Sequence, residues 1–268
     1  MSTDTLTLTT GRAPLAAGGR RSGLARTANY TLASVLMTLR DFLFLFFTIA
    51  FPVMMYLFFA AMFGDQADGA ARTIILMNMA IYGGLGASMS AGTQLQKDAR
   101  SGFLRQLTIA GLSPREFLVG CIACGSIVII PALVVVFAVG AATGAELTVS
   151  TFTLGILVLW LALIPTQLIG IALATFLPES AANAASIALL MALAILGGLW
   201  FPMDQFPEVM QAIGRLTPAY WVAELGQWAV LGANFPPMAL VGIGAWTLAL
   251  LLVCGIGLRR SVARSARR

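Results

Sequence analysis

The residues best suited to interactions with a partner lie in one short stretch, QLQKDARSGFLRQLTIAGLSPREF (residues 94–117). It holds the only lysine of the chain, three arginines, an aspartate and a glutamate, between two long apolar runs. Its apolar residues recur at helical spacing, at Ala99, Phe103, Leu107 and Ala110. Because Arg100 and Arg105 point to other sides, the pattern predicts an amphipathic helix at about 97–111. Such a helix suits either a groove on a soluble partner or lipid headgroups.

Groups for catalysis or metal binding are scarce elsewhere. The chain has no histidine, the commonest metal ligand and general base. The carboxylates are scattered along the sequence, and we identify no nucleophile–base pair, no catalytic residue and no metal site. Cys121 and Cys124 form a C-x-x-C motif, but redox and metal sites need accessible thiolates. Since the motif lies inside an apolar run, we expect both cysteines to be packing residues.

The composition indicates an integral membrane protein. Of the 268 residues, 59% are hydrophobic and 10% are charged, against about 25% charged residues in soluble domains. Six charge-free runs are long enough to cross a bilayer as helices. We place the spans near 42–63, 73–93, 118–140, 152–176, 182–200 and 237–258. The predicted fold class is therefore an all-α integral membrane protein with six transmembrane helices, in which Pro52, Pro131 and Pro165 could kink their spans.

The distribution of basic residues predicts the orientation. Six spans put both termini on one side, together with the 2–3 loop. Five arginines precede the first span, four basic residues lie in the 94–117 stretch, and five arginines close the chain. Only Arg72 and Arg215 fall on the other side, so the termini and the charged loop are expected to be cytoplasmic. We expect a multi-pass protein of a bacterial plasma membrane, with cytoplasmic basic tails at 1–21 and 259–268, of which the N-terminal tail remains on the mature protein.

Two further segments are predicted to lie at the membrane surface. Residues 22–41 show a helical apolar period and read as an interfacial amphipathic helix before the first span. Residues 202–232 mix prolines, acids and large aromatics, which predicts short amphipathic helices at the outer interface, broken at Pro218. These helices could lie flat or dip into the membrane where protein or water meets them.

The predicted spans contain no ionisable residue, which argues against ion-coupled carriers and charged channels. Their polar groups are candidates for lining a pathway for an amphiphilic cargo: Asn78, Tyr82, Thr166, Gln167 and Asn183. Hydrogen bonding between helices is the alternative role for these side chains. Small residues spaced by four in the second span, such as Gly83 and Ala87, predict close helix packing there.

The order of these segments resembles that of the ABC-2 type permeases. In the loop, KDARSGFLRQLTIAGLSPREF is similar to the family pattern E-[RK]-x-x-G-[ST]-[LF]-x-x-L-x-x-x-P-[LV]-[ST]-x-x-x-[FY] through Asp98, Gly102, Leu104, Leu107, Ser113 and Phe117. The outer segment is similar to G-x-x-[FY]-P … [LF]-P … P-x-x-[YW] through Gly198, Phe201, Pro202, Phe206, Pro207, Pro218 and Tyr220. The loop departs from the family by having Asp98 in place of glutamate and Gly111 where proline is common.

The resemblance implies the membrane subunit of an ATP-driven exporter. Two permease copies, identical or related, would form the pathway, and two copies of an ABC ATPase subunit would bind the loops. The ATPase-docking coupling helix would comprise Asp98, Arg100, Gly102, Phe103, Leu104, Arg105 and Leu107. This sequence has no G-x-x-x-x-G-K-[ST] motif, so ATP and Mg²⁺ would bind the ATPase, with no cofactor on this chain, no catalysis by it and no nucleic-acid partner.

The substrate class is predicted from the uncharged spans. They favour an amphiphile such as a drug, an antibiotic or a lipid-like molecule, as in multidrug-resistance exporters. The alternatives are a polysaccharide or glycolipid permease of the same family, an ATP-independent membrane carrier or scaffold, and a lipid-modifying membrane enzyme. The aromatic residues, 9% of the chain and concentrated in the first span, give little support to a sugar pathway.

Overall fold

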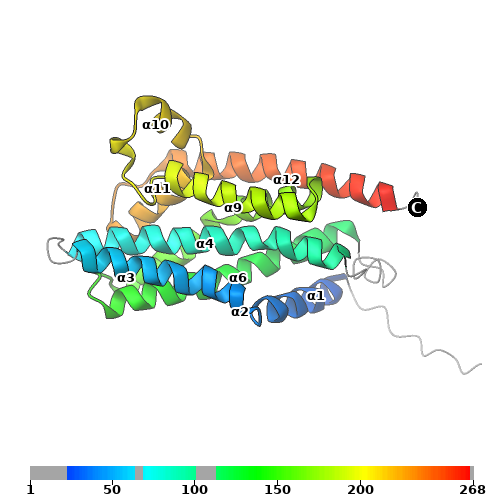
Figure 1. The fold of residues 1–268 in the computed structure, drawn as a ribbon, viewed down its shortest axis with the longest axis horizontal. Helices are drawn as coiled ribbons and strands as arrows, with labels where there is room; N and C mark the ends of the chain where they lie inside the picture. The colour runs from blue at the N-terminus through cyan, green and yellow to red at the C-terminus, as the bar shows by residue number, and fades with distance from the viewer. Residues whose placement is uncertain (1–22, 64–68, 101–112, 266–268) are drawn as a thin grey trace, which may run out of the picture.

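The computed structural model describes residues 23–63, 69–100 and 113–265, and within these ranges the protein is a bundle of helices without strands (Figure 1). Six helical stretches are long and apolar enough to cross a membrane, which confirms the predicted fold class. In chain order the elements are α1 (Gly23–Thr38), α2 (Phe42–Leu45), η1 (Phe46–Ala50), α3 (Phe51–Phe63), α4 (Gly69–Arg100), α6 (Pro114–Ala142), α7 (Val149–Ala162), α8 (Ile164–Phe176), α9 (Glu179–Leu196), η2 (Met203–Gln205), α10 (Glu208–Gly214), α11 (Pro218–Leu231) and α12 (Pro237–Ser265).

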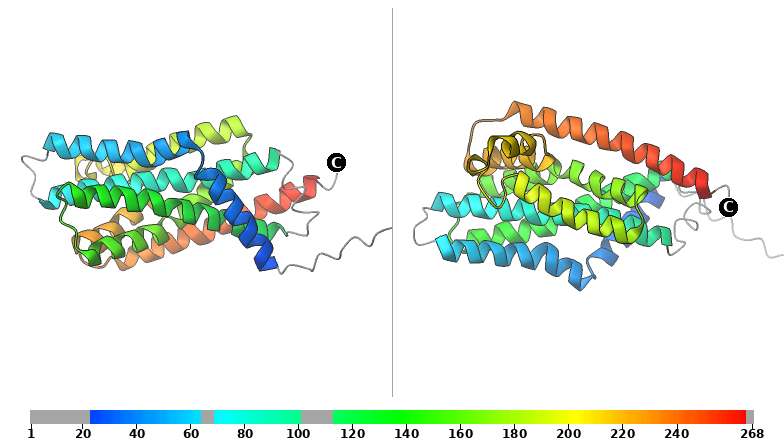
Figure 2. Two further views of the ribbon diagram at one scale, coloured as in Figure 1. Left: turned by 90° about the horizontal axis from the view of Figure 1, so that it is seen from below. Right: turned by 45° about the horizontal axis from the view of Figure 1, so that its top comes forward.

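Helix α4 is the centre of the bundle and the most enclosed of the six spans. It packs against α3, α6, α8, α9 and α11, while α12 lies on the outside against α8 and α11 (Figures 1 and 2). The start of α1, the end of α4 and the end of α12 lie at one end of the bundle, called here the termini end. The opposite end carries the connection from the end of α11 to the start of α12, with α10 protruding beside it.

Glycines allow α4 and α8 to touch through their backbones. A Cβ on Gly92 would overlap the carbonyl group of Gly170, and a Cβ on Gly170 would lie 2.5 Å from the carbonyl oxygen of Met89. One turn away, the hydroxyls of Ser88 and Thr166 form a hydrogen bond of 2.7 Å across the same crossing. The predicted close packing of the second span therefore occurs within this chain, against the fourth span.

The fourth span is two helices rather than one. Helix α7 ends at Ala162 and α8 begins at Ile164, with Leu163 between them. Pro165 stands in the first turn of α8, where its missing N–H costs no helical hydrogen bond. By contrast, Pro131 lies within an unbroken α6. Of the three predicted kink positions, Pro165 marks the clearest interruption.

The first span contains one wide turn. Residues Phe46–Ala50 form a π-helical turn, closed by the N–H of Phe51 donating to the carbonyl of Phe46. Pro52, which has no N–H to donate, follows directly and packs against Gly83 of α4. A Cβ at Gly83 would lie 3.0 Å from both the ring of Pro52 and the carbonyl oxygen of Thr48. The bend of the first span is thus fitted to a glycine on the central helix.

Candidate functional site

The charged stretch joins the two central helices at the termini end. Its residues Gly102, Phe103, Leu104, Arg105 and Leu107 lie outside the described residues, whereas Asp98 and Arg100 belong to the last turn of α4. Helix α4 has 32 residues and is therefore about 48 Å long, against about 30 Å for a hydrocarbon core. It is long enough to carry its last turns clear of the bilayer.

Helix α6, which follows the stretch, has a well-defined N-terminal cap. The hydroxyl of Ser113 accepts a hydrogen bond from the N–H of Glu116, and the Glu116 carboxylate accepts one of 2.7 Å from the N–H of Ser113. Together with a proline at the first helical position, this capping box fixes where α6 starts. The helix ends on both sides of residues 101–112 are therefore defined.

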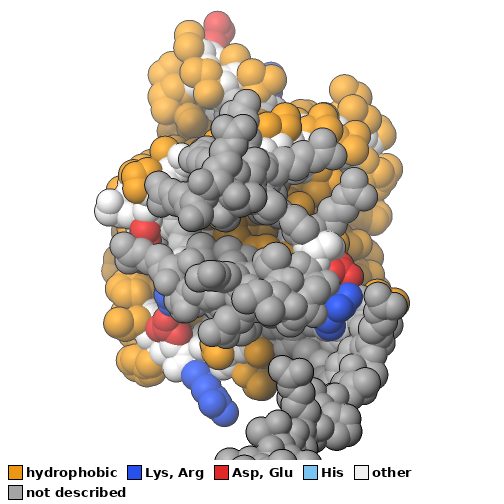
Figure 3. Space-filling view, turned by 90° about the vertical axis from the view of Figure 1, so that its right-hand side faces the viewer, with side chains coloured by type: hydrophobic (Ala, Val, Ile, Leu, Met, Phe, Trp, Pro, Cys, Tyr) orange, Lys and Arg blue, Asp and Glu red, His pale blue; other side chains and the backbone are white. Residues whose placement is uncertain are grey.

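Both of these helix ends form an ion pair with the N-terminal segment. Before the stretch, the Lys97 ammonium lies 3.5 Å from the carboxylate of Asp41, the residue that caps α2. After it, the Arg26 guanidinium on α1 lies 4.0 Å from the Glu116 carboxylate. Basic and acidic side chains are adjacent at this end of the molecule in Figure 3. The pairs are partly exposed, so their role is to orient the segments more than to stabilise them.

Helix α1 is also docked on α6 by packing. The Tyr30 ring covers Gly120, where a Cβ would lie 2.6 Å from the ring, and it contacts the Phe117 ring at a tilt of 46°, with 5.2 Å between the ring centroids. The Tyr30 hydroxyl is 3.3 Å from the thiol of Cys121. On the opposite side of α1, Leu24, Leu32 and Leu36 are exposed. The predicted interfacial helix thus has one face on the protein and an apolar face available to lipid.

The cysteines serve the packing of this region. All three are buried and unpaired by disulfides, and Cys124 packs with Val35 of α1. Among the residues that the structure describes, no group of histidine, cysteine, aspartate and glutamate is arranged for a metal ion. The C-x-x-C therefore lies at the α1–α6 contact.

The predicted pathway residues separate into three environments. Thr166 and Gln167 are fully buried, and the Gln167 amide donates a hydrogen bond of 3.1 Å to Ser126. This bond joins two helices, which is the alternative role that we gave to these polar side chains. Asn183 is exposed on α9, and its side-chain oxygen accepts a hydrogen bond of 3.4 Å from Thr93 on α4. Asn78 and Tyr82 lie towards the end opposite the termini, where Tyr82 packs on Trp200.

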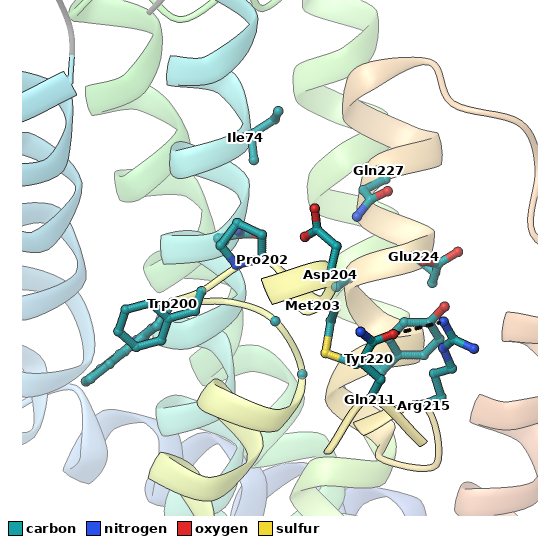
Figure 4. Close-up of a pocket in the computed structure, with 15 residues that line it drawn as sticks. Ile74, Trp200, Pro202, Met203, Asp204, Gln211, Arg215, Tyr220, Glu224 and Gln227 are labelled. Atoms are coloured by element: carbon teal, nitrogen blue, oxygen red, sulfur yellow. Dashed lines mark hydrogen bonds between the residues drawn. The ribbon is translucent and has the colours of Figure 1, made fainter. Parts of the chain in front are cut away.

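A cavity of about 410 Å³ lies beside Asn78, between α4, the α9–α10 connection and α11 (Figure 4). Its walls include Ile74, Trp200, Phe201 and Pro202. The polar side chains that line it are Asn78, Asp204, Gln211, Arg215, Tyr220, Glu224 and Gln227. Two carboxylates and one guanidinium thus face a space large enough for part of a small ligand.

Helix α11 forms the inner wall of this cavity. Thr217 caps it, Pro218 occupies its first turn, and its residues from Ala219 to Val230 are largely buried against α4, α7 and α12. The outer segment therefore does not lie wholly on the surface: α10 protrudes, while α11 runs back along the spans (Figure 1). Of the predicted outer-segment residues, Phe201, Pro202 and Tyr220 line the cavity, Pro218 starts α11, and Pro207 caps α10.

The sequence matches the family described as ABC-2 type transporter over residues 29–231. This chain belongs to that family. It is also similar to a Bacillus subtilis (strain 168) protein named "Putative transport permease YvfS", at 24% identity over 211 residues that cover 77% of this chain and 85% of the relative. The chain is thus a multi-pass membrane permease of an ABC transporter, a family that works with an ABC ATPase.

Two parts of the permease site were missed by sequence reasoning. The Asp41–Lys97 pair joins residues 56 positions apart, although the isolated charge of Asp41 directly before an apolar run was a usable signal. The polar cavity combines Asp204, Arg215 and Glu224, which the sequence shows only as scattered charges. Their grouping depends on α11 folding back against α4, which no local pattern encodes.

Proposed function

We propose that this permease exports an amphiphilic substrate outward, driven by an ABC ATPase that docks on residues 97–111. The observation that carries the proposal is the way this stretch is held. It connects the central helix α4 to α6, and each of its flanks is ion-paired with the segment that leads into the first span. A displacement of the loop is therefore delivered to three spans together.

The proposal places ATP and Mg²⁺ on the partner, because this chain carries no P-loop. In the coupling helix, Arg100 and Arg105 supply charge, and Phe103, Leu104 and Leu107 supply the apolar ridge. An apolar ridge flanked by arginines suits a groove with acidic rims.

The test is affinity purification of the permease from its native membranes, followed by a measurement of ATP hydrolysis in the purified material. The double variant Arg100→Glu/Arg105→Glu is expected to lose the ATPase. The control, Arg259→Glu/Arg260→Glu, reverses two basic residues at the end of the last span and should retain it. Equal ATPase recovery with both double variants would contradict docking on this loop. Transport without any ATPase would instead support the ATP-independent carrier.

We further propose that two copies face one another across α9 and the adjoining face of α4. Asn183 is exposed in the first turns of α9, and small residues surround it at Ala181, Ala184 and Ala188. A polar side chain facing lipid is unfavourable, whereas one facing a second copy or a polar pathway is satisfied. Cysteine in place of Ala184 should cross-link two copies on oxidation, whereas cysteine in place of Leu248 on the exposed face of α12 should not.

The substrate class rests on the same surfaces. The described spans carry few ionisable groups, which suits an amphiphile better than an ion. A sugar chain would need a continuous row of exposed aromatic side chains along the pathway, and the exposed α9 face near Asn183 offers mainly alanine. Export of radiolabelled amphiphiles and of glycan precursors from membrane vesicles would separate the two classes.

A further inference from the structure

The polar cavity near Asn78 lies alongside the spans rather than beyond them. Asn78 is five residues past Thr73, the first uncharged position after Arg72, and so lies about 8 Å further along the helix axis than Thr73. Directly after the lining residue Arg215, the carbonyl of Leu216 accepts a hydrogen bond of 2.9 Å from the Trp246 indole. Trp246 is nine residues into α12, about 13 Å from its start. Half of a hydrocarbon core is about 15 Å, so both markers fall within one leaflet.

Ionisable side chains at such a depth require a reason. Carboxylates and guanidinium groups are costly near lipid and occur there mainly around substrates or water-filled paths. Three of them, Asp204, Arg215 and Glu224, line this one cavity. Neither carboxylate forms an ion pair within 4.0 Å in the part of the chain that the structure describes. Arg215 instead contacts Gln211, with 3.5 Å between its guanidinium nitrogen and the amide oxygen.

The arrangement of charges favours a cationic ligand. In Figure 4, Asp204 and Glu224 come from different walls, η2 and α11, with Gln227 between them in this view. Arg215 lies beside Tyr220 and Gln211, on the Glu224 side of this view. The aromatic ring of Tyr220 adds a face of the kind that attracts organic cations. Counting the lining residues, the cavity holds one more negative than positive charge.

The rim of the cavity is apolar. Phe201 and Ile74, two of its lining residues, have exposed side chains. Beside them, the protruding α10 and the turn after it expose Val209, Ile213 and Leu216 (Figure 1). A ligand with its head group in the cavity could lay an alkyl or aromatic tail along this surface and into lipid.

We propose that this cavity binds the cationic head group of an amphiphile, an alkylammonium or similar protonated amine, in the outer leaflet. The inference rests on the proposed function for the direction of export, and it specifies the substrate class. The cavity belongs to a single chain and is distinct from the face that we assign to the second copy. It is a place where an exported molecule is held before it leaves the membrane.

The test is site-resolved photolabelling of the full-length permease alone in phosphatidylcholine liposomes. Three probes share a dodecyl chain with a diazirine next to the head group, which is trimethylammonium, hydroxyl or sulfate. Mass spectrometry of digested protein measures labelling of the peptides within 197–227. We expect the ammonium probe to label them at least about threefold more than the hydroxyl probe, the ratio that one partly exposed ion pair supports.

Variants at the three charges sharpen the test. Asp204→Asn/Glu224→Gln should lower labelling by the ammonium probe at least about threefold, and Arg215→Gln should raise it. Glu208→Gln is the matched control, because Glu208 is exposed on α10 and does not line the cavity. The opposite signs keep the test decisive even if one variant folds poorly.

Equal labelling by the ammonium and hydroxyl probes, or stronger labelling by the sulfate probe, overturns the proposal. An effect of Glu208→Gln as large as that of the double variant also overturns it, since only general surface charge would then be acting. No ATPase is present in these liposomes. A failure here therefore leaves the coupling proposal standing, and a failure of ATPase recovery leaves the cavity standing.

Discussion

The contact between Gly92 and Gly170 makes a sharp prediction for the substitution Gly92→Ala. The added methyl group would overlap the carbonyl group of Gly170, which is backbone and cannot rotate away. Helices α4 and α8 must separate to admit it, and over-packing of this kind costs up to about 3 kcal/mol. Separation also stretches the 2.7 Å bond between Ser88 and Thr166, worth about 0.6 kcal/mol in a membrane protein.

Alanine is a better helix former than glycine by about 1 kcal/mol, which offsets part of that loss. The net destabilisation is then up to about 2.5 kcal/mol. For a chain of this size we expect the melting temperature to fall by up to roughly 10 °C. The assay is thermal unfolding in a fixed detergent, followed by intrinsic fluorescence, with monodispersity checked by size-exclusion chromatography.

The matched control is Gly244→Ala on α12. Nothing lies within 4 Å of a Cβ at Gly244, so only the propensity gain remains and the melting temperature should stay constant or rise slightly. If Gly92→Ala and Gly244→Ala melt at the same temperature, the backbones of α4 and α8 do not meet as described. The account of the central helix would then be wrong.

Three other substitutions follow from contacts described above. In Gly120→Val, the new side chain would displace the Tyr30 ring and release α1 from α6, so limited proteolysis should cut faster between residues 23 and 41. The control is Gly255→Val, where the added side chain meets open space and the cleavage rate should not change. Reversing Lys97 alone should cost under about 1 kcal/mol of stability but lower the transport-coupled ATPase rate. Reversing Asp41 also removes the cap of α2 and should cost about 1 kcal/mol more. The swap Lys97→Asp/Asp41→Lys should restore the ATPase rate, and a swap no better than the single variants would rule out pairing. Gln167→Leu should lower stability by about 0.6 kcal/mol without changing transport, whereas a selective loss of transport would show that Gln167 does line the pathway.

Sequence reasoning was strongest where burial in lipid dictates composition. The spans follow from charge-free runs, because a bilayer admits only helices whose apolar side chains cover the backbone. The interfacial α1 was also visible, through the period of Leu24, Leu32 and Leu36, which remain exposed. The apolar period did not show that the other face of α1 packs on α6 through Tyr30 and Gly120, because that contact depends on where α6 runs.

Features that depend on packing between distant segments could not be predicted. Pro165 signalled a disturbance in the fourth span, but nothing local indicates that two helices meet at Leu163. The direction of α11 could not be predicted either, because Pro218 indicates where a helix begins but not where that helix runs. The cavity forms because α11 runs in that direction. The sequence alone therefore does not show that Asp204 and Glu224 line the same space.

The π-helical turn at Phe46–Ala50 divides the first span into two parts. A π-helical turn holds one residue more than a turn of the α-helix on either side, so the hydrogen-bond pattern of the span is offset by one residue there. Before this turn come Asp41, which forms an ion pair with Lys97, and the short α2. After it comes the rest of the span, which packs on Gly83 through Pro52. A movement of Lys97 with Asp41 would therefore reach this offset turn before it reaches the part of the span that packs on Gly83.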